Sequence, residues 1–111
     1  MTRLLEQAGA CLEADGCALR VEGQVGFESA AALAEAGRDW LARQPAGTRV
    51  SFDLTGVGDV SSAALSVLLE WARGARTAGL KLQAVQLSPA LRRLTDLAGL
   101  ERLLPVESDA A

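Results

Sequence analysis

Apolar and polar residues alternate from residue 10 to residue 22, which predicts two β-strands. Between them lies Asp15-Gly16, a strong signal for a two-residue hairpin turn. This turn pairs Leu12 with Leu19, and it sorts the hairpin into two faces. The apolar face holds Ala10, Leu12, Leu19 and Val21, with Ala10 opposite Val21, and the polar face holds Glu13, Arg20 and Glu22.

Two later stretches alternate in the same way. Val50, Phe52 and Leu54 alternate with Ser51 and Asp53, and Leu80, Leu82 and Ala84 alternate with Lys81 and Gln83. Strands buried on both faces would read as continuous apolar runs. The alternation therefore predicts an α/β fold with a sheet whose helices lie mainly on one face, while the opposite face is polar. On that polar face we expect Arg20 to pair with Asp53.

A helical period of 3.6 residues marks three further segments. The first runs from Glu28 to Gln44, with Pro45 and Gly47 ending it. The third has Ser88 as N-cap and Pro89 at its first position. The first helix should turn Ala30, Leu33, Ala34, Gly37, Trp40 and Leu41 inward, and the third has its apolar residues at Leu91, Leu94, Leu97 and Ala98 before Gly99. A terminal segment, Leu103–Val106, should pack against these elements.

The second predicted helix, from Ser62 to Ala78, has an unusually wide apolar arc. Its polar residues form one narrow stripe, Ser66, Glu70, Arg73 and Thr77, and nearly all others are apolar. At about 100° per residue the apolar arc spans about 200°, well beyond the arc of an ordinary surface helix. Either the helix packs against the sheet and a neighbouring helix at once, or one flank docks on another protein.

Composition excludes several kinds of site. The 111 residues suit one domain, and a net charge of −3 without a basic stripe argues against nucleic acid as a partner. No apolar run reaches the length of a membrane span and no signal-peptide core is present, so a cytoplasmic location is expected. The chain has no His, and neither its two cysteines nor its scattered acids, Asp15, Asp53, Asp59 and Asp96, suggest a metal site. In the predicted hairpin register Cys11 and Cys17 lie roughly 10 Å apart, so both should be reduced thiols.

The pair Ser61 and Ser62 opens the second helix and is the candidate site. It has three interpretations: a helix cap, a nucleophile, or a hydroxyl whose phosphate would meet free N–H groups and the helix dipole. A nucleophile lacks a histidine and would need Lys81, the one lysine, which belongs to a strand. The preceding Gly56-Val57-Gly58 lacks the remaining residues of a phosphate loop and is interpreted as a turn.

The order of elements, with FDLTGVGDVSSAALSVLLEW and LSPALRRLTDLAGLERLLPV, resembles the STAS domain family, the fold of bacterial anti-sigma-factor antagonists. Within it, the chain looks most like the MlaB branch, the small subunits of the Mla phospholipid-transport ABC complex. The resemblance covers residues 17 to 106 and implies a mixed sheet of four to five strands. It implies one STAS domain over residues 1–106. The small and polar residues of 107–111 predict a flexible tail.

The family motif is an Asp, then Ser or Thr, then a small residue, then often Gly. Here Ser61 stands at the Asp position and Ser62 at the position of the functional hydroxyl, followed by Ala63 and Ala64. In sigma-pathway antagonists that hydroxyl is the kinase target, whereas in MlaB-like subunits it lies at the contact with the ATPase. The resemblance thus implies Ser62 as the contact residue, with Ser61 as cap. The flanking contacts expected from it are Gly58, Asp59, Val60, Ser61, Ala63, Leu65 and Ser66.

The expected function is binding without catalysis and without a cofactor or metal. The resemblance implies an MlaF-like ATPase subunit as partner, within a larger complex with a membrane permease and without direct membrane insertion. The chain would then be cytoplasmic and attached to the inner membrane through the transporter. Two alternatives stay open: an anti-sigma-factor antagonist switched by serine phosphorylation, and a STAS module that binds a nucleotide or lipid itself.

Overall fold

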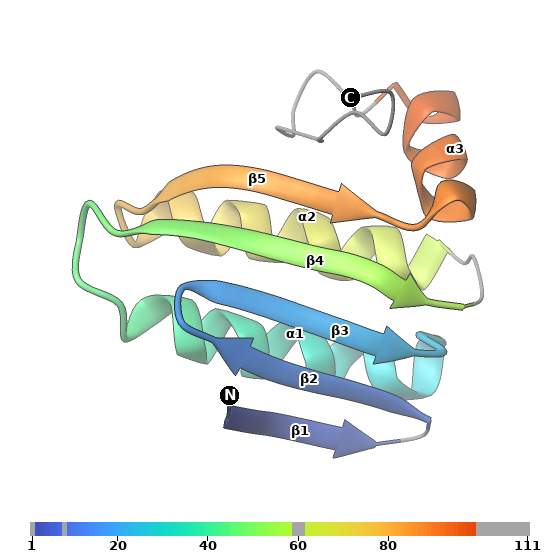
Figure 1. The fold of residues 1–111 in the computed structure, drawn as a ribbon, viewed down its shortest axis with the longest axis horizontal. Coiled ribbons are helices and arrows are strands. Elements are labelled where there is room, and N and C mark those ends of the chain that lie inside the picture. The colour runs from blue at the N-terminus through green and yellow to red at the C-terminus, as the bar shows by residue number, and fades with distance from the viewer. Residues whose placement is uncertain (1, 8, 59–61, 100–111) are drawn as a thin grey trace.

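One five-stranded sheet with the helices α1 and α2 against a single face organises the chain (Figure 1). The computed structural model describes residues 2–7, 9–58 and 62–99. The strands are β1 (Thr2–Gln7), β2 (Ala10–Asp15), β3 (Ala18–Gly23), β4 (Arg49–Val57) and β5 (Lys81–Leu87), and the helices are α1 (Phe27–Ala42), α2 (Ser62–Thr77) and α3 (Pro89–Leu97). The predicted α/β fold with helices mainly on one face is confirmed. The predicted segment Leu103–Val106 and the tail lie outside the described residues.

The sheet is mixed, with its strands in the order β1-β2-β3-β4-β5. The pairs β1–β2 and β2–β3 are antiparallel, whereas β3–β4 and β4–β5 are parallel. Edge strand β1 did not follow from the alternation, because its two leucines, Leu4 and Leu5, are adjacent. A register irregularity between Arg3 and Leu5 lets both pack partly against the core.

The β2–β3 hairpin has the predicted faces in a different register. Its two-residue turn is Gly16-Cys17, so Leu12 pairs with Val21 and not with Leu19. Gly16, the first loop residue of this turn, has a φ of +61°. Each residue of β2 thus pairs with a β3 residue two positions away from the predicted partner. A shift of two residues leaves every side chain on the predicted side of the sheet. Cys11 and Cys17 are both free thiols.

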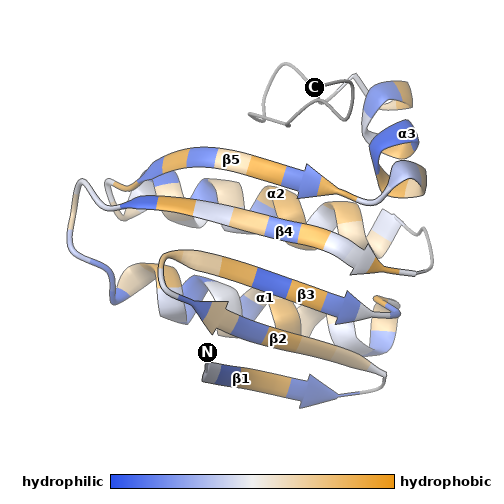
Figure 2. Ribbon diagram, viewed as in Figure 1, coloured by the Kyte–Doolittle hydropathy of each residue, from blue (hydrophilic) through white to orange (hydrophobic). Residues whose placement is uncertain are grey.

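The predicted polar face exists and the predicted ion pair lies on it. Arg20 and Asp53 are register partners on β3 and β4, and Arg20 Nε lies 3.5 Å from Asp53 Oδ2. Figure 2 shows hydrophobic and hydrophilic residues alternating along β3, as the sequence pattern predicted. Polar side chains on this face keep the exposed side of the sheet hydrated while the opposite side is buried by α1 and α2.

One expectation for β5 is wrong. Leu82 pairs with Val50 and packs partly against the core, but the next residue of β4, Ser51, pairs with Ala84. The extra residue in between shifts the alternation, so Ala84 follows the polar face and Val85 and Leu87 are the buried residues. The apolar spacing does record this bulge, because it lengthens from two residues to three between Leu82 and Val85. Assigning Ala84 to the apolar face concealed that change.

Helices α1 and α2 lie side by side and share the core with the sheet (Figure 1). Trp71 of α2 is fully buried, packs edge-on against Phe52 of β4 with ring centroids 5.4 Å apart, and donates from Nε1 to the Leu33 carbonyl of α1 at 3.1 Å. Leu65 and Leu69 are half-buried, and α2 exposes no large hydrophobic side chain. The wide apolar arc of α2 is therefore explained by packing on two neighbours, and it does not by itself indicate a docking flank.

Helix α3 begins as predicted, with the Ser88 hydroxyl accepting from the Leu91 N–H at 3.4 Å and Pro89 in the first position. Leu91 is buried, but Leu97 is 87% exposed. The apolar period of the third helix therefore does not carry Leu97 into the core. The helix is short and packs on β5, with Leu91 and Thr95 buried, while its last residue extends past the core.

Candidate functional site

The predicted site lies at one edge of the sheet, where three strands end and three helices begin. Parallel strands β3, β4 and β5 each end there, and α1, α2 and α3 each start from it (Figure 1). Right-handed crossovers in a parallel sheet bring the helix N-termini to the carboxyl ends of the strands. We call this the carboxyl edge, and it is the edge where open α/β sheets commonly bind their partners.

Ser62 is the first residue of α2 and is exposed at the carboxyl edge. Its carbonyl oxygen accepts a hydrogen bond of 3.0 Å from the Ser66 hydroxyl, which is also exposed. The next three residues are less exposed than Ser62: Ala63 is 4% exposed, Ala64 is fully buried, and Leu65 is half-buried. Of the predicted flanking residues on α2, only Ser66 is well exposed, and Ala63 contributes to the fold.

Before α2, one hydrogen bond connects the end of β4 to the end of β3. The Gly58 N–H donates to the Gly23 carbonyl at 2.9 Å, and Gly58 is exposed. Asp59, Val60 and Ser61 lie outside the described residues, and so does the predicted cap role of Ser61. The interpretation of Gly56-Val57-Gly58 as a turn is wrong for its first two residues, because β4 continues to Val57. Gly56 pairs with Glu22, whose side chain lies where a Cβ would stand.

The acids do not gather into a catalytic or metal-binding group in the described part of the chain. Asp53 accepts from the Thr55 N–H at 3.0 Å and from the Thr55 hydroxyl at 2.6 Å, in addition to its pairing with Arg20. The described residues contain no cluster of three His, Cys, Asp or Glu side chains that could hold a metal ion. Asp53 thus stabilises the polar face of the sheet, as expected from its alternation.

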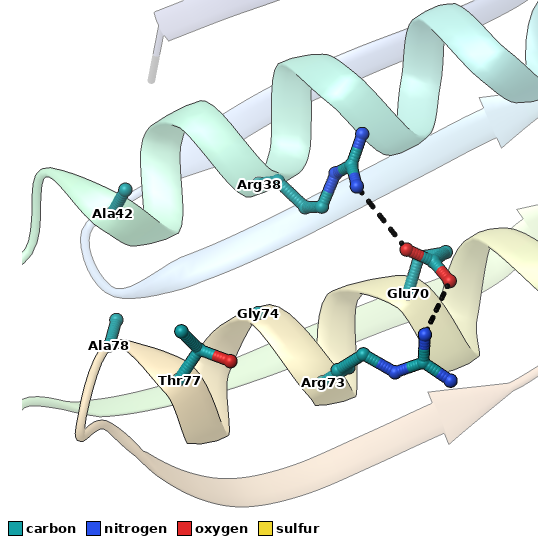
Figure 3. Close-up of a pocket in the computed structure, with 7 residues that line it drawn as sticks. All are labelled: Arg38, Ala42, Glu70, Arg73, Gly74, Thr77 and Ala78. Atoms are coloured by element: carbon teal, nitrogen blue, oxygen red, sulfur yellow. Dashed lines mark hydrogen bonds and ion pairs between the residues drawn. The ribbon is translucent and has the colours of Figure 1, made fainter.

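A hollow of about 500 Å³ lies between α1 and α2, away from the carboxyl edge (Figure 3). At its rim the Glu70 carboxylate bridges Arg38 of α1 at 3.3 Å and Arg73 of α2 at 3.4 Å. These side chains are one-third to three-quarters exposed, so the ion pairs contribute little to stability. The hollow is lined by Arg38, Ala42, Glu70, Arg73, Gly74, Thr77 and Ala78, and none of them is a predicted site residue.

Comparison with known proteins agrees with this architecture. Residues 10–105 match the family model described as "Mlab, STAS domain". The chain belongs to the STAS domain family. The match extends from β2 through the last described helix, and it includes the Ser62 region.

Among solved structures, this STAS domain is similar to an anti-sigma factor antagonist from Mycobacterium paratuberculosis. The two share 25% sequence identity with a TM-score of 0.67, over 87% of this chain and 82% of the other. No curated protein matches the sequence. In the described part of the chain no helix is both long and apolar enough to cross a membrane.

Sequence reasoning located Ser62 but missed a second exposed feature of the carboxyl edge. Phe27, the first residue of α1, is 85% exposed. The helix was expected to begin one residue later, at Glu28, so Phe27 was assigned no face. The available signal was an aromatic residue directly before the predicted helix and outside its apolar stripe.

Proposed function

We propose that this STAS domain is a non-catalytic subunit that binds the ATPase of an ABC-type phospholipid transporter and stabilises or regulates it. In this proposal the domain acts at the cytoplasmic side of the inner membrane, where it is attached through the transporter, and it helps maintain outer-membrane lipid asymmetry. The observation that carries the proposal is the exposed Ser62 at the start of α2, the position at which the family resemblance implies the functional hydroxyl.

Two features support contact at this position rather than chemistry. Ser62 lies on a helix that is anchored by the buried Ala63 and Ala64, so its position is fixed by the core. The chain contains no histidine that could activate the hydroxyl. A small exposed hydroxyl on a rigid helix start suits close approach by another protein, because little conformational entropy is lost on binding.

Introducing a bulky charge at Ser62 should disrupt the complex. We expect Ser62→Arg and Ser62→Glu each to weaken binding to the ATPase by at least tenfold, about 1.4 kcal/mol, because a charge must be buried in the contact. Binding is measured by titration of the purified domain into the ATPase–permease complex, together with ATP hydrolysis. A glutamate at a helix N-terminus is favourable for the helix, so a loss with Ser62→Glu would not reflect unfolding.

Thr77→Arg is the matched control. Thr77 is exposed at the other end of α2, about 22 Å from Ser62 along the helix axis. This variant should bind the ATPase like the wild type. Undiminished binding and hydrolysis with both Ser62 variants would show that the contact lies elsewhere.

A second candidate is an anti-sigma-factor antagonist switched by phosphorylation of Ser62. The similarity to a solved antagonist favours it, and an exposed serine at a helix start can accept a phosphate that the helix N-terminus stabilises. Against it stands Ser61, which replaces the acidic residue of the family motif.

Incubation with an anti-sigma kinase and ATP, followed by intact mass, separates the two candidates. Under the transporter proposal we expect the chain to remain unmodified. One phosphate per chain, abolished by Ser62→Ala, would support the antagonist function instead.

A further inference from the structure

Phe27 is the exposed feature of the carboxyl edge that packing does not explain. Only two large hydrophobic side chains are exposed in the described part of the chain, Phe27 at 85% and Leu97 at 87%. The other phenylalanine, Phe52, is fully buried in the core. An isolated apolar side chain on a surface is common, so exposure alone assigns no role to Phe27.

The exposure of Phe27 becomes informative when it is combined with the position of this residue in the fold. Phe27 opens α1 at the same edge of the sheet at which α2 opens with Ser62 (Figure 1). The ends of β3 and β4, which lead into these two helices, are joined directly by the Gly58–Gly23 hydrogen bond. Phe27 and Ser62 are therefore presented on one continuous edge, although 35 positions separate them in the sequence.

The backbone around Phe27 is held firmly. Val25, two residues earlier, is 3% exposed, and Ser29, two residues later, is fully buried. The Ser29 hydroxyl accepts from the Gly26 N–H at 3.3 Å, which caps the start of α1. Buried neighbours on both sides fix the direction of the chain while the aromatic ring projects from it. Such a ring is preorganised for binding, because ordering it requires little further loss of entropy.

The chain segment that presents Phe27 carries charge of one sign. The stretch 22–28 contains the exposed acids Glu22 and Glu28 and no basic residue. A partner surface that receives the ring should therefore have basic residues around its pocket, since complementary charge favours encounter and disfavours wrong partners. The partner chemistry that fits is an apolar pocket rimmed by Arg or Lys.

We propose that Phe27 is the apolar anchor of the partner interface and inserts into a basic-rimmed pocket on the ATPase subunit. This inference rests on the proposed function and extends its contact from the start of α2 to the start of α1. Interfaces concentrate their binding energy in a few buried residues, often aromatic, surrounded by polar contacts. In this interface Ser62 makes a close polar contact with the partner, and Phe27 is the side chain that becomes buried away from water.

The test compares Phe27→Ala with Leu97→Ala in binding to the purified ATPase–permease complex. The two removed side chains are about equally exposed, so both variants should melt like the wild type. We expect Phe27→Ala to raise the Kd by tenfold or more, Leu97→Ala to leave it within twofold, and Phe27→Leu to fall between. Glu28→Gln should weaken binding modestly and reduce its sensitivity to salt.

The outcomes of these experiments distinguish failure of the Phe27 proposal from failure of the proposed function. If Phe27→Ala binds like the wild type while Ser62→Arg does not, the anchor is overturned and the proposed function stands. If the wild-type domain does not bind the complex, the proposed function and the anchor both fail. Sedimentation of the isolated domain tests a second copy as the occupant. A dimer that Phe27→Ala converts to a monomer, with unchanged ATPase binding, would assign the ring to self-association and overturn the proposal.

Discussion

Replacing Gly37 with alanine is expected to destabilise the domain by about 2–3 kcal/mol, although alanine is the better helix former by about 1 kcal/mol. Gly37 lies in α1 directly against Trp71 of α2. A Cβ at this position would overlap Nε1 and Cε2 of the indole, and Cδ1 would lie 2.9 Å away. The ring cannot move aside easily, because it is fully buried, packs on Phe52 and donates to Leu33.

Gly74 provides the matched control, since it lies on the facing side of the same helix pair. A Cβ on Gly74 would meet Cγ of Arg38 at 3.3 Å, and that half-exposed side chain can shift. Gly74→Ala should therefore be neutral or stabilising, by up to about 1 kcal/mol. Chemical denaturation of the two variants measures the difference directly.

A double-mutant cycle identifies the clash as the cause. Trp71→Leu removes Nε1 and Cε2, the two indole atoms closest to Gly37. Gly37→Ala should then cost about 1 kcal/mol less in the Trp71→Leu background than in the wild type. Strict additivity would mean that the close approach of α1 and α2 at this point does not limit the stability.

Replacing Gly23 with alanine is expected to cost about 3 kcal/mol or more, and it should disturb the candidate site as well. Gly23 ends β3 at φ +99°, a conformation that L side chains rarely adopt. A Cβ here would overlap the Gly9 carbonyl oxygen and stand 3.3 Å from Ala10 Cα, and backbone atoms cannot rotate away as a side chain can. Conformational strain of about 1–2 kcal/mol and overpacking of about 1–3 kcal/mol then add.

Gly16→Ala separates these two contributions. Gly16 has φ +61° in the β2–β3 turn, but nothing lies within 4 Å of its Cβ position. It should therefore show only the conformational strain, about 1–2 kcal/mol. Equal losses at Gly16 and Gly23 in chemical denaturation would show that the contact with Gly9 is unimportant.

Hydrogen exchange follows the effect of Gly23 on the site. Its carbonyl accepts from the Gly58 N–H, immediately before the segment that leads to Ser62. In Gly23→Ala the Gly58 amide should exchange faster than in the wild type, while in Gly16→Ala it should be unchanged. The chain just after β4, at Gly58, is thus held by a residue of β3 that lies far from it in sequence.

Local pattern determined much of this protein. Alternation assigned one buried and one polar face to β4 and predicted the pairing of Arg20 with Asp53, because side chains alternate strictly between the faces of a strand. The cap at Ser88 and the position of Ser62 at a helix start also followed from neighbouring residues. The family resemblance added the functional position of that serine.

Tertiary structure decided the rest, because the deciding contacts join residues distant in sequence. The wide apolar arc of α2 allowed either packing or docking, and only the positions of α1 and the sheet showed that packing accounts for it. The bulge that turns Ala84 outward arises from pairing with β4. The exposed Phe27 stands on one edge with Ser62 because parallel strands and their crossovers bring the helix starts together, which no local pattern encodes.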